Sequence, residues 1–133
     1  MTQLVLHFIN GQQKEGQSKR RGDVYNPVRG EITKQVVLAN QADLNTAITA
    51  AKTAQPEWAR VTPLRRARVM FAFNQLIEQN FEELAALISE EHGKTLDDAR
   101  GEVTRGKEVV EFACGAPQLL KAHFSENIGT DVD

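Results

Sequence analysis

Apolar residues follow two different rhythms along this chain of 133 residues. Up to residue 39 they form short runs rich in strand formers, chiefly Leu4–Ile9 and Ile32–Ala39. Turn formers separate the runs, with a hairpin signal at Asn10-Gly11 and a second turn at Asn26-Pro27. This pattern predicts strands and turns over residues 1–39.

From residue 40 the apolar spacing changes to three and four, which predicts about four helices over residues 40–124. A polar tail over residues 125–133 shows no strong pattern. The expected apolar stripes, one for each helix, are Leu44, Ala47, Ile48 and Ala51; Ala67, Met70, Phe73 and Ile77; Phe81, Leu84 and Ile88; and Ala99, Val103, Gly106, Val110, Ala113 and Pro117.

Residues typical of helix ends frame these stripes. A cap followed by an acid three positions on, or by proline, opens each helix: Asn40 with Asp43, Thr62 with Pro63, Asn80 with Glu83, and Thr95 with Asp98. Pro56 is expected to end the first helix and leave Trp58 in a tight connection, and His92-Gly93 to end the third. Gly106 lies on the last stripe, which makes sense if another backbone approaches there.

The order of these elements indicates the fold class. A few strands come first and a run of helices follows, with no parallel strands interleaved. Four amphipathic helices have more apolar face than short strands can cover. The sequence therefore predicts an α/β architecture that is part of a layered domain, with the main parallel sheet missing from this chain.

Composition excludes several classes of function. The chain is 41% apolar with a formal net charge of -2, so it has no field that favours nucleic acid. Its densest basic run, Lys19-Arg20-Arg21, falls in the polar segment Gly16–Gly22 and reads as a solvated loop. No apolar run is long enough for a membrane span. With one cysteine and no signal peptide, a cytoplasmic protein is the default expectation.

Candidate chemistry is sparse. Cys114 is the only thiol, but it lies near the apolar stripe of the last helix, and nearby Glu111 disfavours a thiolate, so a buried structural cysteine is expected. Gly93-Lys94-Thr95 resembles the end of a P-loop, yet Ile88 stands where that motif needs glycine.

The remaining candidates for metal or acid-base chemistry also favour structural interpretations. The three histidines, His7, His92 and His123, lack the spacing of a zinc motif, and Glu90-Glu91-His92 reads as a solvated helix end. The acidic pairs Glu82-Glu83 and Asp97-Asp98 fit the first turns of helices. No catalytic, cofactor-binding or metal-binding residue is therefore assigned.

An ordered series of short motifs nevertheless resembles the opening of aldehyde dehydrogenases. The motifs are Phe8-Ile9-Asn10-Gly11, Val24-Tyr25-Asn26-Pro27 with Gly30, Ala47, Ala50-Ala51, Trp58, Leu76-Ile77, Glu83-Leu84-Ala85 and Glu91-His92-Gly93-Lys94. A narrower similarity, to the CoA-acylating methylmalonate-semialdehyde dehydrogenase branch, lies in Glu90–Ala99, Gly101-Glu102-Val103, Val109–Gly115, Pro117, Leu119-Leu120-Lys121 and Ser125-Glu126-Asn127. Ala122 departs from the glycine expected after that lysine.

The resemblance implies an NAD-dependent oxidoreductase of valine catabolism that converts malonate or methylmalonate semialdehyde to acetyl-CoA or propionyl-CoA and releases carbon dioxide. It also implies a Rossmann-like cofactor domain, of which residues 1–133 would be an incomplete N-terminal portion. The family's nucleophilic cysteine, assisting glutamate, oxyanion asparagine and glycine-rich cofactor turn come later in its sequences. Cys114 corresponds to a helical position of the family and not to its nucleophilic cysteine. NAD and CoA are therefore expected of the full-length enzyme and not of this chain alone.

Three interpretations follow. The leading one is a truncated or split dehydrogenase that is inactive by itself, with the rest of the enzyme or a full-length subunit as its partner. The alternative is a non-enzymatic helical interaction module that binds such a subunit or another partner. The third is a minimal enzyme that uses Cys114. Uncovered apolar stripes also predict self-association of the isolated chain.

Overall fold

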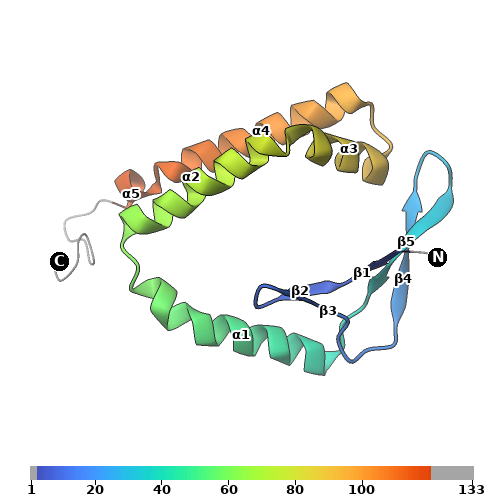
Figure 1. Cartoon of the computed structure of the whole chain (residues 1–133), viewed down its shortest axis with the longest axis horizontal. Coiled ribbons are helices and arrows are strands. Elements are labelled where there is room, and N and C mark those ends of the chain that lie inside the picture. Colours follow the sequence, from blue (N-terminus) through green and yellow to red (C-terminus); the bar gives the residue numbers. More distant parts are fainter. Residues whose placement is uncertain (1–2, 121–133) are drawn as a thin grey trace. The chain divides into compact units, whose positions relative to one another are not determined.

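A computed structural model describes residues 3–120 of the chain (Figure 1). The chain divides into two compact units, residues 1–58 and residues 59–133. Within the described residues, the first unit contains strands β1 to β5 and nearly all of helix α1, and the second contains helices α2 to α5. Residues 121–133, which include the expected polar tail, lie outside the described part. The few strands followed by helices match the predicted α/β class.

The first unit contains a mixed sheet in the order β1-β5-β4. Strand β5 (Glu31–Val37) lies in the middle, parallel to β1 (Gln3–Val5) and antiparallel to β4 (Arg21–Asn26). The parallel pair joins Gln3 to Lys34 in register. Sequence patterning predicted strands at β1 and β5 but gave no sign that the two would run parallel to each other.

The expected single strand Leu4–Ile9 is in fact divided between two sheets. Its first part is β1, whereas its second part is β2 (His7–Ile9), which pairs antiparallel with β3 (Gln12–Lys14). Leu6 lies outside both strands. One continuous strand was therefore the wrong interpretation, because the hydrogen-bonding partner changes at Leu6 from β5 to β3.

Both predicted turns are confirmed by the backbone. Asn10 and Gly11 have φ values of +53° and +72°, the pair of positive values that a two-residue type I′ hairpin requires. In the second turn Gly30 has φ +69°, and its N–H donates to the carbonyl oxygen of Asn26 at 2.8 Å. The side-chain oxygen of Asn26 accepts bonds from the N–H groups of Val28 and Arg29, which fixes the turn.

Helix α1 (Gln41–Ala59) begins as predicted and ends later than predicted. Asn40 and Asp43 cap it reciprocally: the Asn40 side chain accepts from the Asp43 N–H at 2.9 Å, and the Asp43 carboxylate accepts from the Asn40 N–H at 3.0 Å. The expectation that Pro56 ends the helix is wrong, and Trp58 belongs to its last turn. Pro56 lies in the last turn of α1, so its missing N–H removes one backbone hydrogen bond near the helix end and leaves the bonds of the preceding turns intact.

The second unit is a helical cluster in which α4 (Leu96–Cys114) packs against both α2 (Pro63–Gln79) and α3 (Phe81–His92). A short helix, α5 (Ala116–Leu119), follows α4, and Pro117 lies in its first turn. Ala85 and Ala99 are both completely inaccessible to solvent. Their small side chains lie in the core that joins α3 to α4, which Val103 extends.

Three of the predicted helix ends in this unit are confirmed. The Thr62 hydroxyl accepts from the N–H of Arg65 and the Thr95 hydroxyl from that of Asp98, while Gly93 ends α3 with φ +71°. The side-chain cap expected from Asn80 is wrong. Because α2 and α3 are joined by this single residue, its amide instead donates to the Leu76 carbonyl at the end of α2, at 2.7 Å.

Two predicted stripes also need correction. On α2 the predicted stripe residue Phe73 is exposed, and its neighbour Asn74 is half-buried instead. On α4 the buried residues are Ala99, Val103 and Cys114, and Gly106 is exposed with no atom near the place of a side chain. Spacings of three and four fit more than one face of a helix, and the packing of α2 on α4 selects one. The expected close approach of a backbone at Gly106 does not occur within the described residues.

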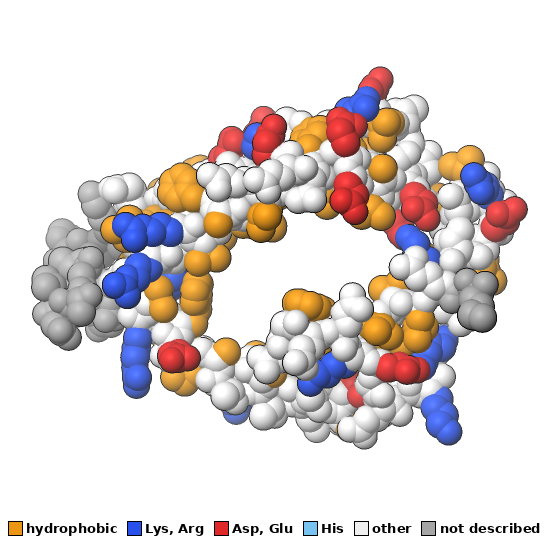
Figure 2. Space-filling model, viewed as in Figure 1, with side chains coloured by type: hydrophobic (Ala, Val, Ile, Leu, Met, Phe, Trp, Pro, Cys, Tyr) orange, Lys and Arg blue, Asp and Glu red, His pale blue; other side chains and the backbone are white. Residues whose placement is uncertain are grey.

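Many large apolar side chains reach the surface of the helices (Figure 2). On α1, Leu44 and Ile48 are each about half exposed, and on α4 Val109 and Phe112 are more so. No helix in the part of the chain that the structure describes is long and apolar enough to cross a membrane. The expectation of more apolar helix face than the chain covers is met within residues 3–120.

The contact between Ala85 and its neighbours on α4 predicts a steep dependence of stability on side-chain volume. Ala85→Leu should lower the free energy of unfolding by about 1–3 kcal/mol, because a fully enclosed position cannot accept a larger side chain without displacement. Ala86→Leu adds the same atoms at an exposed position of the same helix and should change it by less than about 0.5 kcal/mol. Urea unfolding followed by circular dichroism gives both values, and equal effects would contradict the packing described here.

Candidate functional site

The most enclosed charged group in the described residues is the carboxylate of Asp43, at the start of α1, which is only 5% exposed. One of its oxygens accepts the N–H of Gln17 at 2.7 Å, and the other accepts the N–H of Asn40. Gly16 has φ +78°, and a side-chain carbon there would lie 2.9 Å from the carboxylate. The polar loop before β4 is therefore fastened directly to the first turn of the helix.

These hydrogen bonds keep Asp43 ionised. The backbone N–H of Asn40 is the largest influence and that of Gln17 the next, and both lower the pKa of Asp43 because they stabilise the carboxylate form. The N-terminus of α1 thus already has an anion of its own. A second anion, such as a phosphate, would meet a like charge there.

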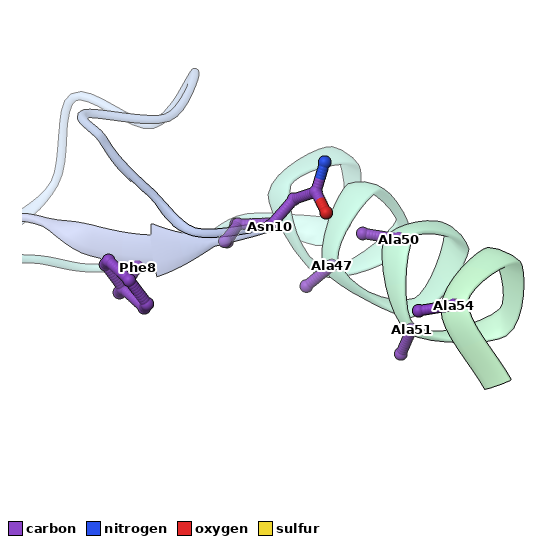
Figure 3. Close-up of a pocket in the computed structure, with 7 residues that line it drawn as sticks. Phe8, Asn10, Ala47, Ala50, Ala51 and Ala54 are labelled. Carbon is purple, nitrogen blue, oxygen red and sulfur yellow. The ribbon is translucent and has the colours of Figure 1, made fainter. Parts of the chain in front are cut away.

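A shallow apolar groove lies in the same unit, beside the β2–β3 hairpin and α1 (Figure 3). It has a volume of about 260 Å³ and is lined by Phe8, Ile9, Asn10, Ala47, Ala50, Ala51 and Ala54. Asn10 is the only polar side chain in this lining. With no acid, base, thiol or hydroxyl in its lining, the groove can hold apolar atoms but cannot perform acid-base or nucleophilic chemistry.

The segment Gly93-Lys94-Thr95 forms the turn between α3 and α4 and not a phosphate-binding loop. The Lys94 ammonium is paired with the Glu102 carboxylate, and the Lys94 carbonyl accepts the Ser89 hydroxyl at 2.7 Å. The Lys94 side chain lowers the pKa of Glu102, since it stabilises the ionised carboxylate. The lysine that would bind a phosphate in a P-loop is thus already engaged, which supports the rejection of that motif.

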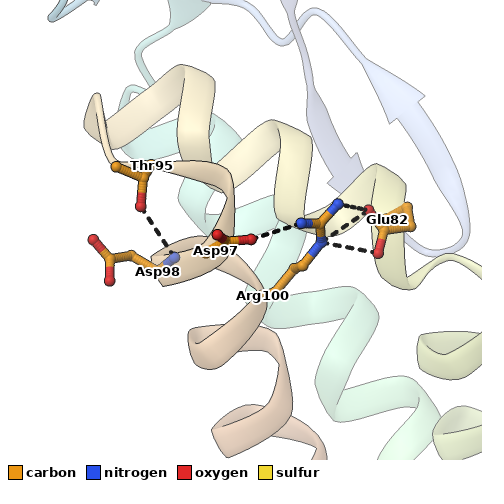
Figure 4. Close-up of polar contacts among 5 residues, drawn as sticks. All are labelled: Glu82, Thr95, Asp97, Asp98 and Arg100. Carbon is orange, nitrogen blue, oxygen red and sulfur yellow. Dashed lines mark hydrogen bonds and ion pairs between the residues drawn. The ribbon is translucent and has the colours of Figure 1, made fainter.

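One acid from each acidic pair binds Arg100 of α4, and Glu82 of α3 thereby joins the two helices (Figure 4). The Arg100 guanidinium donates to both oxygens of Glu82, with the shortest bond at 2.8 Å, and to Asp97 at 2.8 Å. Glu82 raises the pKa of Arg100, and Arg100 lowers that of Glu82, so each stabilises the charged form of the other. These carboxylates are not available as a general acid and base.

The remaining candidates are also placed by the structure. Cys114 is buried at 8% exposure at the end of α4, as expected for a structural thiol. His7 lies in β2 and His92 ends α3, while His123 lies outside the described residues. Within residues 3–120 no three histidine, cysteine or carboxylate side chains gather where they could hold a metal ion.

The basic run at residues 19–21 only partly fits a solvated loop. Arg21 opens β4, where its guanidinium pairs with Glu15 at 2.5 Å, and the Arg20 guanidinium donates to the Ala39 carbonyl at 2.8 Å. Both arginines therefore fasten the loop that Asp43 holds at its other side. The sequence indicated Asp43 only as part of a helix cap, and its role in this loop could have been suspected only from the glycine at position 16.

The family of this chain follows from its similarity to known proteins. Residues 14–131 match the model of the aldehyde dehydrogenase family, and the chain belongs to that family. Its described part has the fold of the N-terminal portion of those enzymes. A structure from Sinorhizobium meliloti 1021, described as a methylmalonate-semialdehyde dehydrogenase complexed with NAD, superposes with a TM-score of 0.89 at 48% identity.

Other relatives belong to the same branch. The malonate-semialdehyde dehydrogenase of Pseudomonas aeruginosa is 48% identical over 96% of this chain. The methylmalonate-semialdehyde dehydrogenase structure from Oceanimonas doudoroffii is 50% identical over 97% of it, with a TM-score of 0.87. The chain spans about a quarter of the length of these relatives, 25% of the first and 26% of the second. The resemblance inferred from the sequence motifs is therefore confirmed.

The family uses NAD, but the described residues do not fit the phosphates of that cofactor. A Rossmann-type site needs a glycine-rich turn from a strand into a helix with free N–H groups. The turn from β5 into α1 is the one passage from strand to helix in residues 3–120, and Asn40 and Asp43 cap it.

Replacement of Asp43 tests this enclosed carboxylate. Asp43→Asn should lower the melting temperature at neutral pH by several degrees. An amide has only one acceptor oxygen, so its NH₂ group would face one of the two backbone N–H groups that the carboxylate now accepts. The matched control is Asp98→Asn, which lies at the same position of α4 but is exposed (Figure 4), and it should have little effect.

The effect should depend on pH in a defined direction. The pKa of Asp43 is lower in the folded chain than its ordinary value of about 3.9 in an unfolded one. Its stabilising contribution is therefore complete above that ordinary value and is lost as the pH falls through the lowered one. Melting temperatures measured from pH 7 to pH 3 should show the gap between wild type and Asp43→Asn closing below about pH 4. A gap that stays constant would mean that the charge of Asp43 is irrelevant.

Proposed function

We propose that this chain provides the N-terminal portion of an NAD-dependent, CoA-acylating malonate- or methylmalonate-semialdehyde dehydrogenase. The reaction joins the acyl carbon of the semialdehyde to the thiol of CoA, releases carbon dioxide and transfers a hydride to NAD, giving acetyl-CoA or propionyl-CoA and NADH. The observation that supports this assignment most directly is the 48% identity to the Pseudomonas aeruginosa enzyme over nearly the whole chain. Within this proposal the enzyme acts in the cytoplasm, in valine catabolism.

In this proposal the chain contributes structure and not chemistry. The one thiol, Cys114, is buried in the helical cluster, and the turn at Lys94 is held by an ion pair. The N-terminus of α1 is capped by Asn40 and carries the Asp43 carboxylate, whose negative charge disfavours a phosphate there. A nucleophile, a cofactor turn and a CoA site must then come from polypeptide that corresponds to the other three quarters of the relatives.

The chain alone should therefore have no dehydrogenase activity. Incubation with methylmalonate semialdehyde, CoA and NAD should produce no NADH above the blank, measured as absorbance at about 340 nm under conditions in which a full-length relative turns over fully. Cys114→Ala serves as the control variant. Turnover by the wild type that Cys114→Ala abolishes would instead support the third interpretation, a minimal enzyme that uses this thiol.

The chain alone should also show no specific affinity for NAD. Calorimetric titration should give no saturable heat at micromolar NAD, because Asp43 occupies the strand-to-helix turn. The same titration with Asp43→Asn tests whether the carboxylate is what excludes the phosphates. Saturable binding by the wild type would mean that the described residues form a cofactor site after all.

A second candidate function is a non-enzymatic interaction module. The observation in its favour is the exposure of large apolar side chains, such as Val109 at 68% and Phe112 at 69%. Exposed apolar faces of this kind mark interaction surfaces or sites of self-association. The module would bind a full-length subunit without turnover. It differs from the leading proposal in that supplying the missing three quarters of the enzyme would restore no activity.

A further inference from the structure

The tip of the β2–β3 hairpin places Asn10 directly before Gly11. Both residues are exposed and both have positive φ, so they form the two central positions of the turn. In a turn of this kind the hydrogen bond joins the residues on either side of the central pair. The N–H of Gly11 is therefore not engaged by the turn and stays open to solvent.

The side-chain amide of Asn10 is free to move. Within residues 3–120 no hydrogen bond involves this side chain, which forms part of the lining of the apolar groove beside α1 (Figure 3). Its carbonyl carbon can therefore approach the backbone nitrogen of the next residue. Glycine hinders this approach least because it has no Cβ, and no atom lies within 4 Å of the place where the Cβ of Gly11 would be.

The other asparagines in the described part of the chain are restrained. The half-buried Asn74 lies inside α2, where the N–H of the following residue belongs to the helical ladder. The remaining ones all take part in side-chain hydrogen bonds: Asn26, Asn40, Asn45 and Asn80. Asn10 thus differs from each of them in both its side chain and its neighbour.

The β2–β3 hairpin can also open by itself. Its two strands have three residues each and pair only with each other, apart from the β1-β5-β4 sheet. A two-stranded hairpin is marginally stable, and the local opening of such an element needs less free energy than the unfolding of a domain. The backbone at Asn10 can therefore leave the turn conformation, and bring the side chain onto the Gly11 nitrogen, while the larger sheet stays formed.

We propose that Asn10 is a site of spontaneous deamidation. The Gly11 N–H gives its proton to hydroxide, and the nitrogen attacks the side-chain carbonyl carbon of Asn10. A C–N bond forms, the bond to the amide nitrogen breaks, and that nitrogen takes up a proton and leaves as ammonia. Water then opens the five-membered succinimide at either carbonyl carbon, which gives aspartate or isoaspartate. Nothing is oxidised or reduced, and the step does not depend on the reaction proposed for the whole enzyme.

The two products affect the hairpin differently. Aspartate before glycine suits the same turn, so this product keeps the hairpin and adds a carboxylate to a groove whose lining has no other polar side chain. Isoaspartate continues the chain through the side-chain carbon and lengthens the backbone by one CH₂ group. Because the turn fixes the register of the two strands, the longer backbone should disrupt the pairing of Ile9 with Gln12.

The test follows each asparagine of the folded 133-residue chain by mass spectrometry of its proteolytic peptides. Conversion is a mass gain of about 1 Da, the difference between a carboxyl and an amide group, and chromatography separates the two products. At mildly alkaline pH Asn10 should convert at least about tenfold faster than Asn45, which is also exposed but lies in α1. The conversion should be slower at neutral pH, because the attacking nitrogen must lose its proton.

The same chain unfolded in urea shows what the sequence does without the hairpin. Asn10→Asp provides the standard for the aspartate product, and Asn10→Gln should show no conversion at this position on the same timescale, because its ring would need six members. Conversion of Asn10 in the folded chain that is no faster than that of Asn45, or that occurs only in urea, would overturn the proposal.

Hydrogen exchange tests the structural consequence. In the isoaspartate product the backbone N–H groups of β2 and β3 should exchange faster than in Asn10→Asp, whereas those of β4 and β5 should exchange alike in both. Equal exchange of the hairpin in the two forms would overturn the disruption of its register.

Discussion

The packing of α4 against two helices at once is the constraint on which the second unit depends. Ala85 and Ala99 are completely enclosed, so α3 and α4 approach closely, and Val103 continues the same core. Because a close-packed interior admits little change in volume, the small size of these residues sets the distance between the helices. The ion pairs of Arg100 with Glu82 and of Lys107 with Glu78 lie at the edges of this contact and fix its register.

The first unit depends on a different kind of contact. There a single carboxylate, that of Asp43, joins the polar loop to the start of α1 through backbone N–H groups separated by more than twenty residues. Gly16 is required beside it both because its φ is positive and because a side chain would collide with the carboxylate. The same arrangement places a carboxylate at the helix N-terminus, and its negative charge disfavours the binding of another anion there.

Local sequence signals anticipated much of this fold. Turn residues with positive φ, as at Asn10-Gly11, and caps such as Thr95 act over a few positions, so their geometry could be read directly. Features that depend on distant partners could not be: the parallel pairing of β1 with β5, and the choice between Phe73 and Asn74 on α2, are decided by neighbours that periodicity does not name. Likewise Asn80 could serve either adjoining helix, and tertiary context directed its amide to the carbonyl end of α2.

The candidate site was anticipated to a different extent. Motif spacing identified the family. It also argued against a P-loop at Lys94, because Ile88 stands where that motif needs glycine, and the ion pair of Lys94 with Glu102 agrees with this conclusion. The enclosure of Asp43 had only Gly16 as a sequence signal, since the spacing of residues 16–43 does not indicate that the loop folds back on the helix.

The position of the short strand β1 also has a consequence for the chain during its synthesis. Its three residues, Gln3 to Val5, cover one edge of β5, whose end carries Val36 and the buried Val37. An apolar strand with an uncovered edge is a template for pairing with other molecules. The parallel pairing of β1 with β5 can form only after some thirty further residues have been synthesised, because the two strands are far apart in the sequence. A nascent chain of this sequence would therefore carry an unpaired β1 until β5 has been made, and β5 would find its edge partner already present when it emerges.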